Sequence, residues 1–274
     1  MKNSSEFYII DLFKKVLSGG NVSDGDQKRV FDALEKEIKE RPFKVAVIGQ
    51  AGVGKSTTLN SVFGLDHYTS SVSEGTTDII EEVFEIRDGF KLAVYDMPGL
   101  NVSVKKDLIY EEKYKKILPG CDVVIYIINA HSRDIGEDCR ILKNVVIPIC
   151  KDNNILKNLV IAVNKIDTVG EPQNEEPYPV ELQWDEEENK PTPQLAKLIE
   201  EKLHIINVAL VKAHIIDNSE NVNANQFVIY SAMYNFNLRD FFMAILNTER
   251  GWIWATTVGI ENIGKWSDKR LNIS

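Results

Sequence analysis

Apolar residues near the start of the chain recur every three or four positions, which is the spacing of one face of a helix. This spacing occurs in residues 9–16 and again in residues 30–38. Gly19 and Gly20 are expected to end the first helix, and Pro42 is expected to close the second. Two amphipathic helices are therefore predicted before the first strand.

Unbroken apolar runs later in the chain indicate strands that are covered on both faces, as in parallel sheets. These runs are FKVAVIG (43–49), DVVIYIIN (122–129), NLVIAVN (158–164) and QFVIYSA (226–232). Residues 83–96 instead alternate apolar with polar positions on one side of a turn at Asp88 and Gly89, and this pattern predicts a hairpin.

Helical stretches are expected between these strands, around residues 134–147, 194–213 and 237–248. Strands that alternate with helices predict an α/β fold, in which a mostly parallel sheet lies between two layers of helices. The hairpin would add one antiparallel edge strand to this three-layer arrangement.

The composition is that of a globular protein with a sizeable core, with 274 residues, 43% of them hydrophobic and 27% charged. The formal net charge of −9 argues against binding nucleic acid or anionic lipid through overall charge. The three cysteines lack the paired spacing of a zinc site and are expected to be reduced, packed thiols. No stretch resembles a signal peptide or a membrane span, which predicts a cytoplasmic protein.

The sequence GQAGVGKS lies between the first strand and a helix, which is the context that a phosphate-binding loop requires. Its glycines let successive backbone N–H groups point at phosphate oxygens, and the helix N-terminus adds partial positive charge. Lys55 is expected to reach the outer phosphates, and Ser56 is expected to give its hydroxyl to magnesium. The alternative is a flexible glycine turn without a ligand.

The sequence NKID follows another apolar strand, so its side chains are expected at the same carboxyl edge of the sheet. Asp167 can accept both the ring N–H and the exocyclic amine of guanine, whereas adenine has no matching pair of donors. Asn164 can bridge the base and the phosphate loop, and the stem of Lys165 can cover the purine face. An ordinary polar strand end is the alternative.

Five short motifs occur in a fixed order: GQAGVGKS, GTTD, DMPG, NKID and YSA. In this order they resemble the guanine-nucleotide motifs of P-loop GTPases of the TrmE-Era-Septin superfamily, most similar to Era-like proteins of the bacterial YfjP type, across about residues 43–248. The resemblance implies a Ras-like G domain with a mostly parallel six-stranded sheet. It also implies Mg²⁺ as cofactor and GTP or GDP as ligand.

The resemblance assigns further roles to single residues. Thr77 should bind magnesium when the terminal phosphate is present, with Thr76 as the weaker candidate. Asp96 should hold magnesium through water, and the Gly99 amide should meet the terminal phosphate. The expected nucleotide-binding residues are Ala51, Gly52, Val53, Gly54, Lys55, Ser56, Thr57, Asn164, Lys165, Asp167, Ser231 and Ala232, the last two through a backbone that reaches guanine O6. The expected catalytic residues are Lys55, Thr77 and Gly99, and the expected metal-binding residues are Ser56, Thr77 and Asp96.

Leu100 follows the DMPG motif, where GTPases of the Ras type hold a glutamine that orients water. Era-like GTPases commonly hold an apolar residue there, so the leucine agrees with the resemblance. Packing beneath the turn is an alternative role for its side chain. We therefore expect slow intrinsic hydrolysis that self-association or a partner raises.

The motifs divide the chain into an N-terminal helical segment (1–42), a GTP-binding domain (43–249) and a tryptophan-rich tail (250–274). An acidic, proline-rich insertion at residues 170–190 is expected to be solvated, with an interaction loop as the alternative. The tail is expected to pack on the N-terminal helices, and membrane contact through it is the less favoured alternative.

The function that these observations favour is a switch that binds GTP and hydrolyses it slowly to GDP and phosphate. The alternatives are a GTP-dependent binding module with negligible turnover and a membrane-associated, self-assembling GTPase of the dynamin-like or immunity-related type. The expected partners are a guanine nucleotide, a protein effector of unknown identity and, in the nucleotide-bound state, a second copy of the chain.

Overall fold

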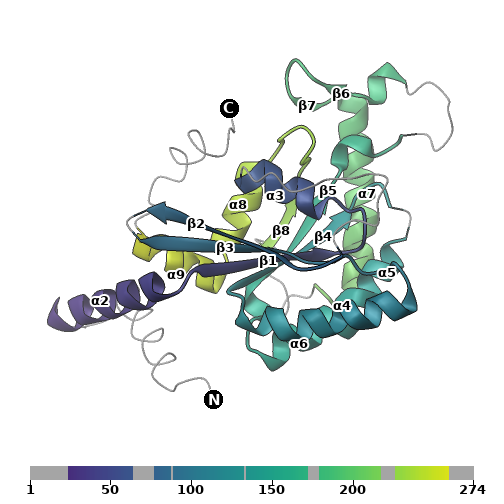
Figure 1. The fold of residues 1–274 in the computed structure, drawn as a ribbon. Helices are drawn as coiled ribbons and strands as arrows, with labels where there is room; N and C mark the ends of the chain where they lie inside the picture. Colours follow the sequence, from purple (N-terminus) through teal and green to yellow (C-terminus); the bar gives the residue numbers. More distant parts are fainter. Residues whose placement is uncertain are drawn as a thin grey trace.

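The computed structural model describes residues 24–63, 77–87, 89–132, 134–171, 179–216 and 226–258. A six-stranded sheet in the order β2-β3-β1-β4-β5-β8 forms its centre (Figure 1). Its strands are β1 (Phe43–Gly49), β2 (Ile80–Arg87), β3 (Phe90–Asp96), β4 (Val123–Asn129), β5 (Leu159–Asn164) and β8 (Phe227–Ile229). Only β2 runs antiparallel to its neighbour in this sheet, which confirms the predicted fold class.

Helices cover both faces of the sheet (Figure 1). The described helices are α2 (Asp24–Glu40), α3 (Lys55–Phe63), α4 (Val104–Ile117), α5 (Ile135–Ile141), α6 (Ile147–Asp152), α7 (Pro193–Lys212), α8 (Leu238–Leu246) and α9 (Glu249–Val258). One apolar core lies between the sheet and α4 to α7, and a second lies between the sheet and α3, α8 and α9. Strands β1, β4 and β5 are buried on both faces, which explains their unbroken apolar runs.

The helix predicted around residues 134–147 is longer and less regular than expected. A π-helical turn at Leu142–Val146 joins α5 to α6, and Pro148 follows it at the start of α6. Proline has no backbone N–H, so the α-helical hydrogen-bond pattern cannot continue unbroken through this position. The apolar spacing of the sequence does not reveal such a turn.

The insertion is only partly solvated in the structure. The prediction of a solvated loop is wrong for Trp184, which is 8% exposed and lies in a short hairpin of β6 (Trp184–Asp185) and β7 (Lys190–Pro191). The indole packs against Tyr234 and Phe236, two residues that follow β8. Residues 172–178 of the insertion lie outside the described residues.

The segments that flank the sheet meet at its edge away from the motifs. Trp254 of α9 is buried and stacks on Phe43 at the start of β1, with ring centroids 4.8 Å apart, and α9 also contacts α2. Trp252 is 42% exposed. The first predicted helix and the tail beyond Val258 lie outside the described residues, and among the helices that are described none is both long and apolar enough to cross a membrane.

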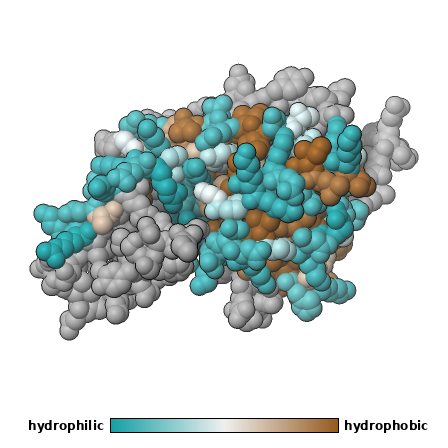
Figure 2. Space-filling view, turned by 60° about the horizontal axis from the view of Figure 1, so that its bottom comes forward, coloured by the Kyte–Doolittle hydropathy of each residue, from teal (hydrophilic) through white to brown (hydrophobic). Residues whose placement is uncertain are grey.

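One face of the molecule carries several exposed apolar side chains on α4. Val104 is 81% exposed, Leu108 60% and Ile109 50%. Figure 2 brings forward the side that is lower in Figure 1, where α4 and α6 lie, and shows apolar patches among polar surface. Helix α4 begins directly after the turn that follows β3, so this apolar surface is adjacent to the DMPG motif.

Candidate functional site

The phosphate loop (residues 49–56) lies between β1 and α3, as predicted. Gly54 has φ +93°, and a Cβ at this position would come within 2.5 Å of the Asn164 side-chain nitrogen, so the close approach of the two loops requires glycine. Helix α3 begins at Lys55. Backbone N–H groups in the first turn of a helix have no intrahelical partner, and their partial positive charge suits an anion such as phosphate.

Lys55 lies buried within this loop, with a relative exposure of 7%. Its Nζ donates a hydrogen bond to the backbone carbonyl of Gln50 at 2.9 Å. Burial lowers the pKa of the Lys55 ammonium to about 8, and the nearby Asp96 carboxylate opposes this shift. The loop therefore holds a cation in a place where it is poorly solvated, and an anionic ligand would stabilise it.

Ser56 and Asp96 form a pair of oxygen ligands at the end of β3. The Ser56 hydroxyl donates to Oδ2 of Asp96 at 2.5 Å, and Asp96 is fully buried beside Val47 of β1. A hydroxyl and a carboxylate are ligands that Mg²⁺ accepts, and magnesium in phosphate sites uses few protein ligands. The residues present therefore fit a magnesium ion.

The turn after β3 (residues 97–101, the switch turn) lies directly on the phosphate loop. The Leu100 N–H donates to the Gly49 carbonyl at 3.1 Å, and the Ala51 N–H donates to the Leu100 carbonyl at 2.8 Å. A Cβ on Gly99 would lie 2.7 Å from both the Ala51 backbone nitrogen and Lys55 Nζ. Only glycine leaves room for this approach, which brings the Gly99 backbone next to Lys55.

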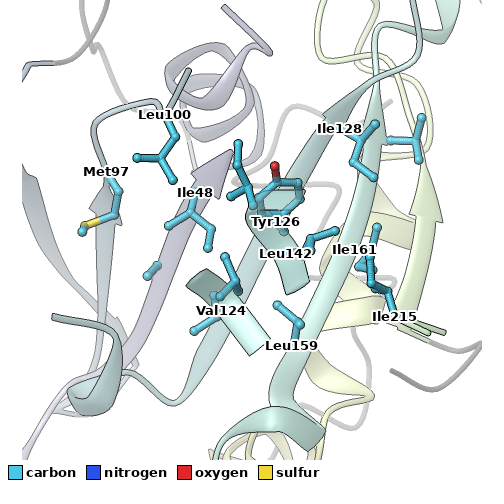
Figure 3. Close-up of a cluster of buried hydrophobic side chains, with 14 of the residues drawn as sticks. Ile48, Met97, Leu100, Val124, Tyr126, Ile128, Leu142, Leu159, Ile161 and Ile215 are labelled. Atoms are coloured by element: carbon cyan, nitrogen blue, oxygen red, sulfur yellow. The ribbon is translucent and has the colours of Figure 1, made fainter. Parts of the chain in front are cut away.

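The Leu100 side chain points away from the phosphate loop into the core. It is 1% exposed and lies among apolar side chains that include Ile48 and Met97 (Figure 3). On the far side of the switch turn, the Tyr114 hydroxyl donates to the Pro98 carbonyl at 2.8 Å. Leu100 therefore contributes its backbone to the site and its side chain to packing.

Thr77 contacts α4 in the structure. Its carbonyl accepts a hydrogen bond from Lys113 Nζ of α4 at 3.1 Å, and Lys113 also pairs with Asp78 at 2.8 Å. The contacts of Thr77 in the structure do not include Ser56 or Asp96. Thr76 lies outside the described residues, so the role of either threonine toward magnesium stays a prediction.

Asn164 joins the phosphate loop to the turn after β8. Its side-chain amide donates to the Val53 carbonyl at 3.0 Å, and its Oδ1 accepts from the Ala232 N–H at 3.0 Å. Lys165 has φ +63°, and its Nζ donates to the Gly52 carbonyl at 2.8 Å. The structure thus brings NKID, the phosphate loop and Ala232 together, as the sequence predicts for one site.

Asp167 has a buried carboxylate oxygen whose hydrogen-bonding capacity is unused. The residue is 8% exposed, and Oδ1 has no hydrogen-bond partner within the part of the chain that the structure describes. A buried acceptor that lacks a partner is costly. A ligand that carries hydrogen-bond donors, placed against this oxygen, would remove that cost.

Two residues of α3, Thr58 and Ser61, hold the site together and are not apparent from the motifs. The Thr58 and Tyr230 hydroxyls share a hydrogen bond of 2.8 Å, and the Ser61 hydroxyl donates to the Ala232 carbonyl at 2.9 Å. These bonds fix α3, which carries Lys55, to the turn after β8. The signal in the sequence is weak: Thr58 and Ser61 are polar residues one helical turn apart in the helix that follows the phosphate loop.

Comparison with known proteins shows which family part of this chain matches. Residues 44–165 match the model of the family described as 50S ribosome-binding GTPase. The chain is 32% identical over 130 residues to GTPase Der of Enterococcus faecalis, which is 44% of this chain and 29% of that protein. It is 30% identical over 125 residues to the tRNA modification GTPase MnmE of Clostridioides difficile, which is 44% of this chain and 27% of that protein. The chain therefore spans less than a third of the length of these relatives.

Solved structures show the same fold. The crystal structure of a variant of Aquifex aeolicus Era bound to GDP and AlF₄⁻ superposes with a TM-score of 0.52 at 23% identity, covering 75% of this chain and 56% of that one. LeoA, a bacterial dynamin GTPase from ETEC, superposes with a TM-score of 0.51 at 15% identity, covering 96% of this chain and 46% of that one. These likenesses show the fold alone. The family match and the Der and MnmE relatives show that residues 44–165 belong to a P-loop GTPase domain of the TrmE-Era-Septin superfamily.

Proposed function

We propose that this chain binds GTP with magnesium and hydrolyses it slowly to GDP and phosphate, acting as a nucleotide-dependent switch. The observation that carries this proposal is the buried Asp167 oxygen, which has no partner among the described residues. Asp167 belongs to the same NKID motif as Asn164, whose side chain is hydrogen-bonded directly to the phosphate loop. One ligand with a base at one end and phosphates at the other accounts for both features.

Guanine is the base that this geometry favours. Its ring N–H and exocyclic amine are adjacent donors that match the two oxygens of one carboxylate, whereas adenine presents no such pair. Lys165 crosses from the NKID turn to Gly52, so its stem lies where it can cover one face of the purine. In this proposal the backbone of Ser231 and Ala232 meets guanine O6.

The phosphate loop supplies the charge for the reaction. In this proposal the N–H groups of residues 52–57 and the Lys55 ammonium bind the phosphates, and Gly99 offers its N–H to the terminal one. Magnesium, when bound by Ser56 and Asp96, would neutralise negative charge on the phosphate oxygens. Water then attacks the terminal phosphorus in line with the bond to GDP, and Lys55 with the backbone amides stabilises the charge on the transferred group.

No side chain of the switch turn is proposed to orient the attacking water, because Leu100 is turned into the core. Slow intrinsic hydrolysis follows, and a partner that supplies an arginine in trans can raise such a rate by about 10³- to 10⁵-fold. The exposed apolar surface on α4 lies next to the switch turn and supports a partner there. A protein effector and a second copy of this chain both remain part of the proposal.

We also propose that the chain is Era-like and acts in the bacterial cytoplasm. The apolar residue at position 100 supports the first assignment. The bacterial relatives and three free cysteines support the second, since thiols persist in reducing compartments. Thr77 is proposed to reach magnesium through its side-chain hydroxyl when the terminal phosphate is present, and in the structure its backbone carbonyl accepts from Lys113.

Phosphate release in a single turnover tests the proposed activity. With protein in excess over GTP and with magnesium present, we expect slow release whose rate constant increases with protein concentration if a second copy completes the site. Lys55→Ala should abolish release because it removes the cation at the phosphates. A wild-type protein that binds GTP but releases no phosphate at any concentration would contradict the proposed hydrolysis and would favour a GTP-dependent binding module.

A further inference from the structure

The two ends of the turn that carries Ala232 are hydrogen-bonded to each other. Residues 231–236, the base-side turn, begin and end with a pair of backbone hydrogen bonds between Ser231 and Phe236, of 3.1 and 3.0 Å. The Ser231 hydroxyl also accepts from the Tyr234 N–H at 3.2 Å. The backbone atoms proposed to read the base therefore move together with the rings of Tyr234 and Phe236.

The hairpin of the acidic insertion contacts both of these rings. The Trp184 indole stacks on Tyr234 with centroids 5.0 Å apart and an interplanar angle of 18°. It meets Phe236 edge-on, with centroids 5.1 Å apart and an angle of 79°. Both arrangements are favourable for aromatic rings, and Trp184 is buried by them.

The hairpin itself is anchored to the body of the domain. The Trp184 Nε1–H donates to Oδ1 of Asn189 across the hairpin at 3.2 Å. Thr192 caps the N-terminus of α7, and its hydroxyl also donates to the Glu181 carbonyl at 2.6 Å. The hairpin is thus held to α7 (Figure 1), and Trp184 connects α7 to the base-side turn.

We infer that Trp184 is a positioning residue for recognition of the guanine six-position, because it clamps the base-side turn against the rest of the nucleotide site. This inference rests on the proposed guanine site. From the opposite side, Ser61 of α3 holds the Ala232 carbonyl, so the turn is fixed between α3 and the hairpin. Removing Trp184 frees the turn to move, which weakens the contact to O6 and hastens nucleotide release, while Asp167 still reads the amine.

The test compares nucleotide release and base selectivity in Trp184→Ala and wild-type full-length protein. Because the variant loses the stacked ring that holds the turn, a fluorescent GDP analogue should dissociate from it roughly 2- to 10-fold faster than from the wild type. Competition with 6-thio-GDP, altered only at the six-position, should show a reduced preference for GDP. Competition with IDP, which lacks only the amine that Asp167 reads, should show an unchanged preference.

Three further variants keep this test decisive. Trp184→Phe retains a ring at the clamp and should restore most of the wild-type release rate. Tyr234→Leu removes the stacked ring from the other side and should reproduce Trp184→Ala, even if Trp184→Ala itself folds poorly. Trp252→Ala, which truncates a half-exposed indole on α9, should leave release and selectivity unchanged.

Two results would overturn the inference. One is folded Trp184→Ala and Tyr234→Leu protein with wild-type release and selectivity. The other is an equal loss of affinity for GDP, 6-thio-GDP and IDP, since that would indicate general destabilisation. A failure of the proposed function would give a different result: the wild type would bind GDP and ADP equally well, and Asp167→Asn would leave the affinity for GDP unchanged.

Discussion

Lys55 is placed to bind phosphate, and its burial there costs free energy because the charged ammonium is poorly solvated. The ammonium is buried, and burial lowers its pKa to about 8. Among the described residues it donates one hydrogen bond, to the backbone carbonyl of Gln50. A lysine at this place favours a phosphate ligand because the ligand restores the charge interactions that burial removed. Asp167 is the anionic counterpart: its buried oxygen also costs free energy, and a hydrogen-bond donor on the ligand would remove that cost.

The affinity for GDP should therefore depend on the protonation of Lys55. In the free protein the ammonium loses its proton as the pH rises through about 8, whereas contact with phosphate raises its pKa in the complex. Affinity is then complete below pH 8 and falls above it, by roughly tenfold between pH 7 and pH 9. Fluorescence titration of a GDP analogue across this range measures the effect.

Lys55→Arg is the control for this pH dependence. Arginine keeps its charge throughout the range, so its complex should retain only the dependence that comes from the nucleotide itself. The same pH profile in wild type and Lys55→Arg would show that the buried lysine does not titrate as its environment indicates.

At the scale of elements, the site is the meeting point of the turns that follow β1, β3, β5 and β8. The sequence predicts this much, because apolar parallel strands bring their carboxyl ends to one edge and because the motifs follow those strands directly. Lys55, Asp96 and Asn164 lie where the motifs suggest. The sequence offers packing beneath the turn as one role for Leu100, and the structure shows this packing, but the core space between β1 and α4 that decides it is not specified by any local pattern.

The packing of Trp184 could not be predicted for a related reason. Its neighbours Tyr234 and Phe236 are far away in the sequence, and the acidic residues around Trp184 suggest a solvated loop. Thr77 illustrates another limit: the motif suggests a metal ligand, and the structure shows its carbonyl accepting from Lys113, a residue of α4 that no motif singles out.

Helix α4 should stabilise the switch turn through Tyr114. The residue is fully buried, and its hydroxyl satisfies the Pro98 carbonyl. Tyr114→Phe leaves that carbonyl without its partner and should lower the free energy of unfolding by about 1–3 kcal/mol, as measured by urea denaturation. Tyr110→Phe is the matched control, because Tyr110 is buried on the same helix and its hydroxyl makes no hydrogen bond to the described residues. Equal losses in the two variants would contradict the role given to the Pro98 contact.

At the scale of the whole molecule, Asp122 joins both flanking segments to the sheet. The carboxylate is 2% exposed, accepts two hydrogen bonds from Arg41, at 2.7 and 2.8 Å, and a third from Arg250 at 3.0 Å. Arg41 follows α2 and Arg250 lies in α9, while Asp122 precedes β4 at the edge opposite the nucleotide site. The flanks are therefore part of the stability of the domain.

Asp122→Ala should lower the free energy of unfolding by about 1–3 kcal/mol, because it removes the buried acceptor that Arg41, Arg250 and the Lys44 backbone N–H share. Urea denaturation of the nucleotide-free protein measures this loss. Lys36→Ala breaks an exposed pair with Glu40 on α2 and should change stability by less than about 1 kcal/mol. GDP affinity of the folded Asp122→Ala protein should stay close to wild type, and a large loss of affinity would contradict the separation of the two edges.

The central claim is that one guanine nucleotide spans the phosphate loop and Asp167. Calorimetric titration of the magnesium-supplemented protein with GDP tests it most directly. We predict one site for GDP and no binding of ADP. We also predict that Asp167→Asn lowers the affinity for GDP by roughly 10²- to 10⁴-fold. The variant should instead bind xanthosine diphosphate, because the asparagine amide can donate to the 2-oxo group of xanthine. A wild-type protein that gives no heat with GDP or GTP, or an Asp167→Asn variant that keeps its preference for GDP, would contradict the account.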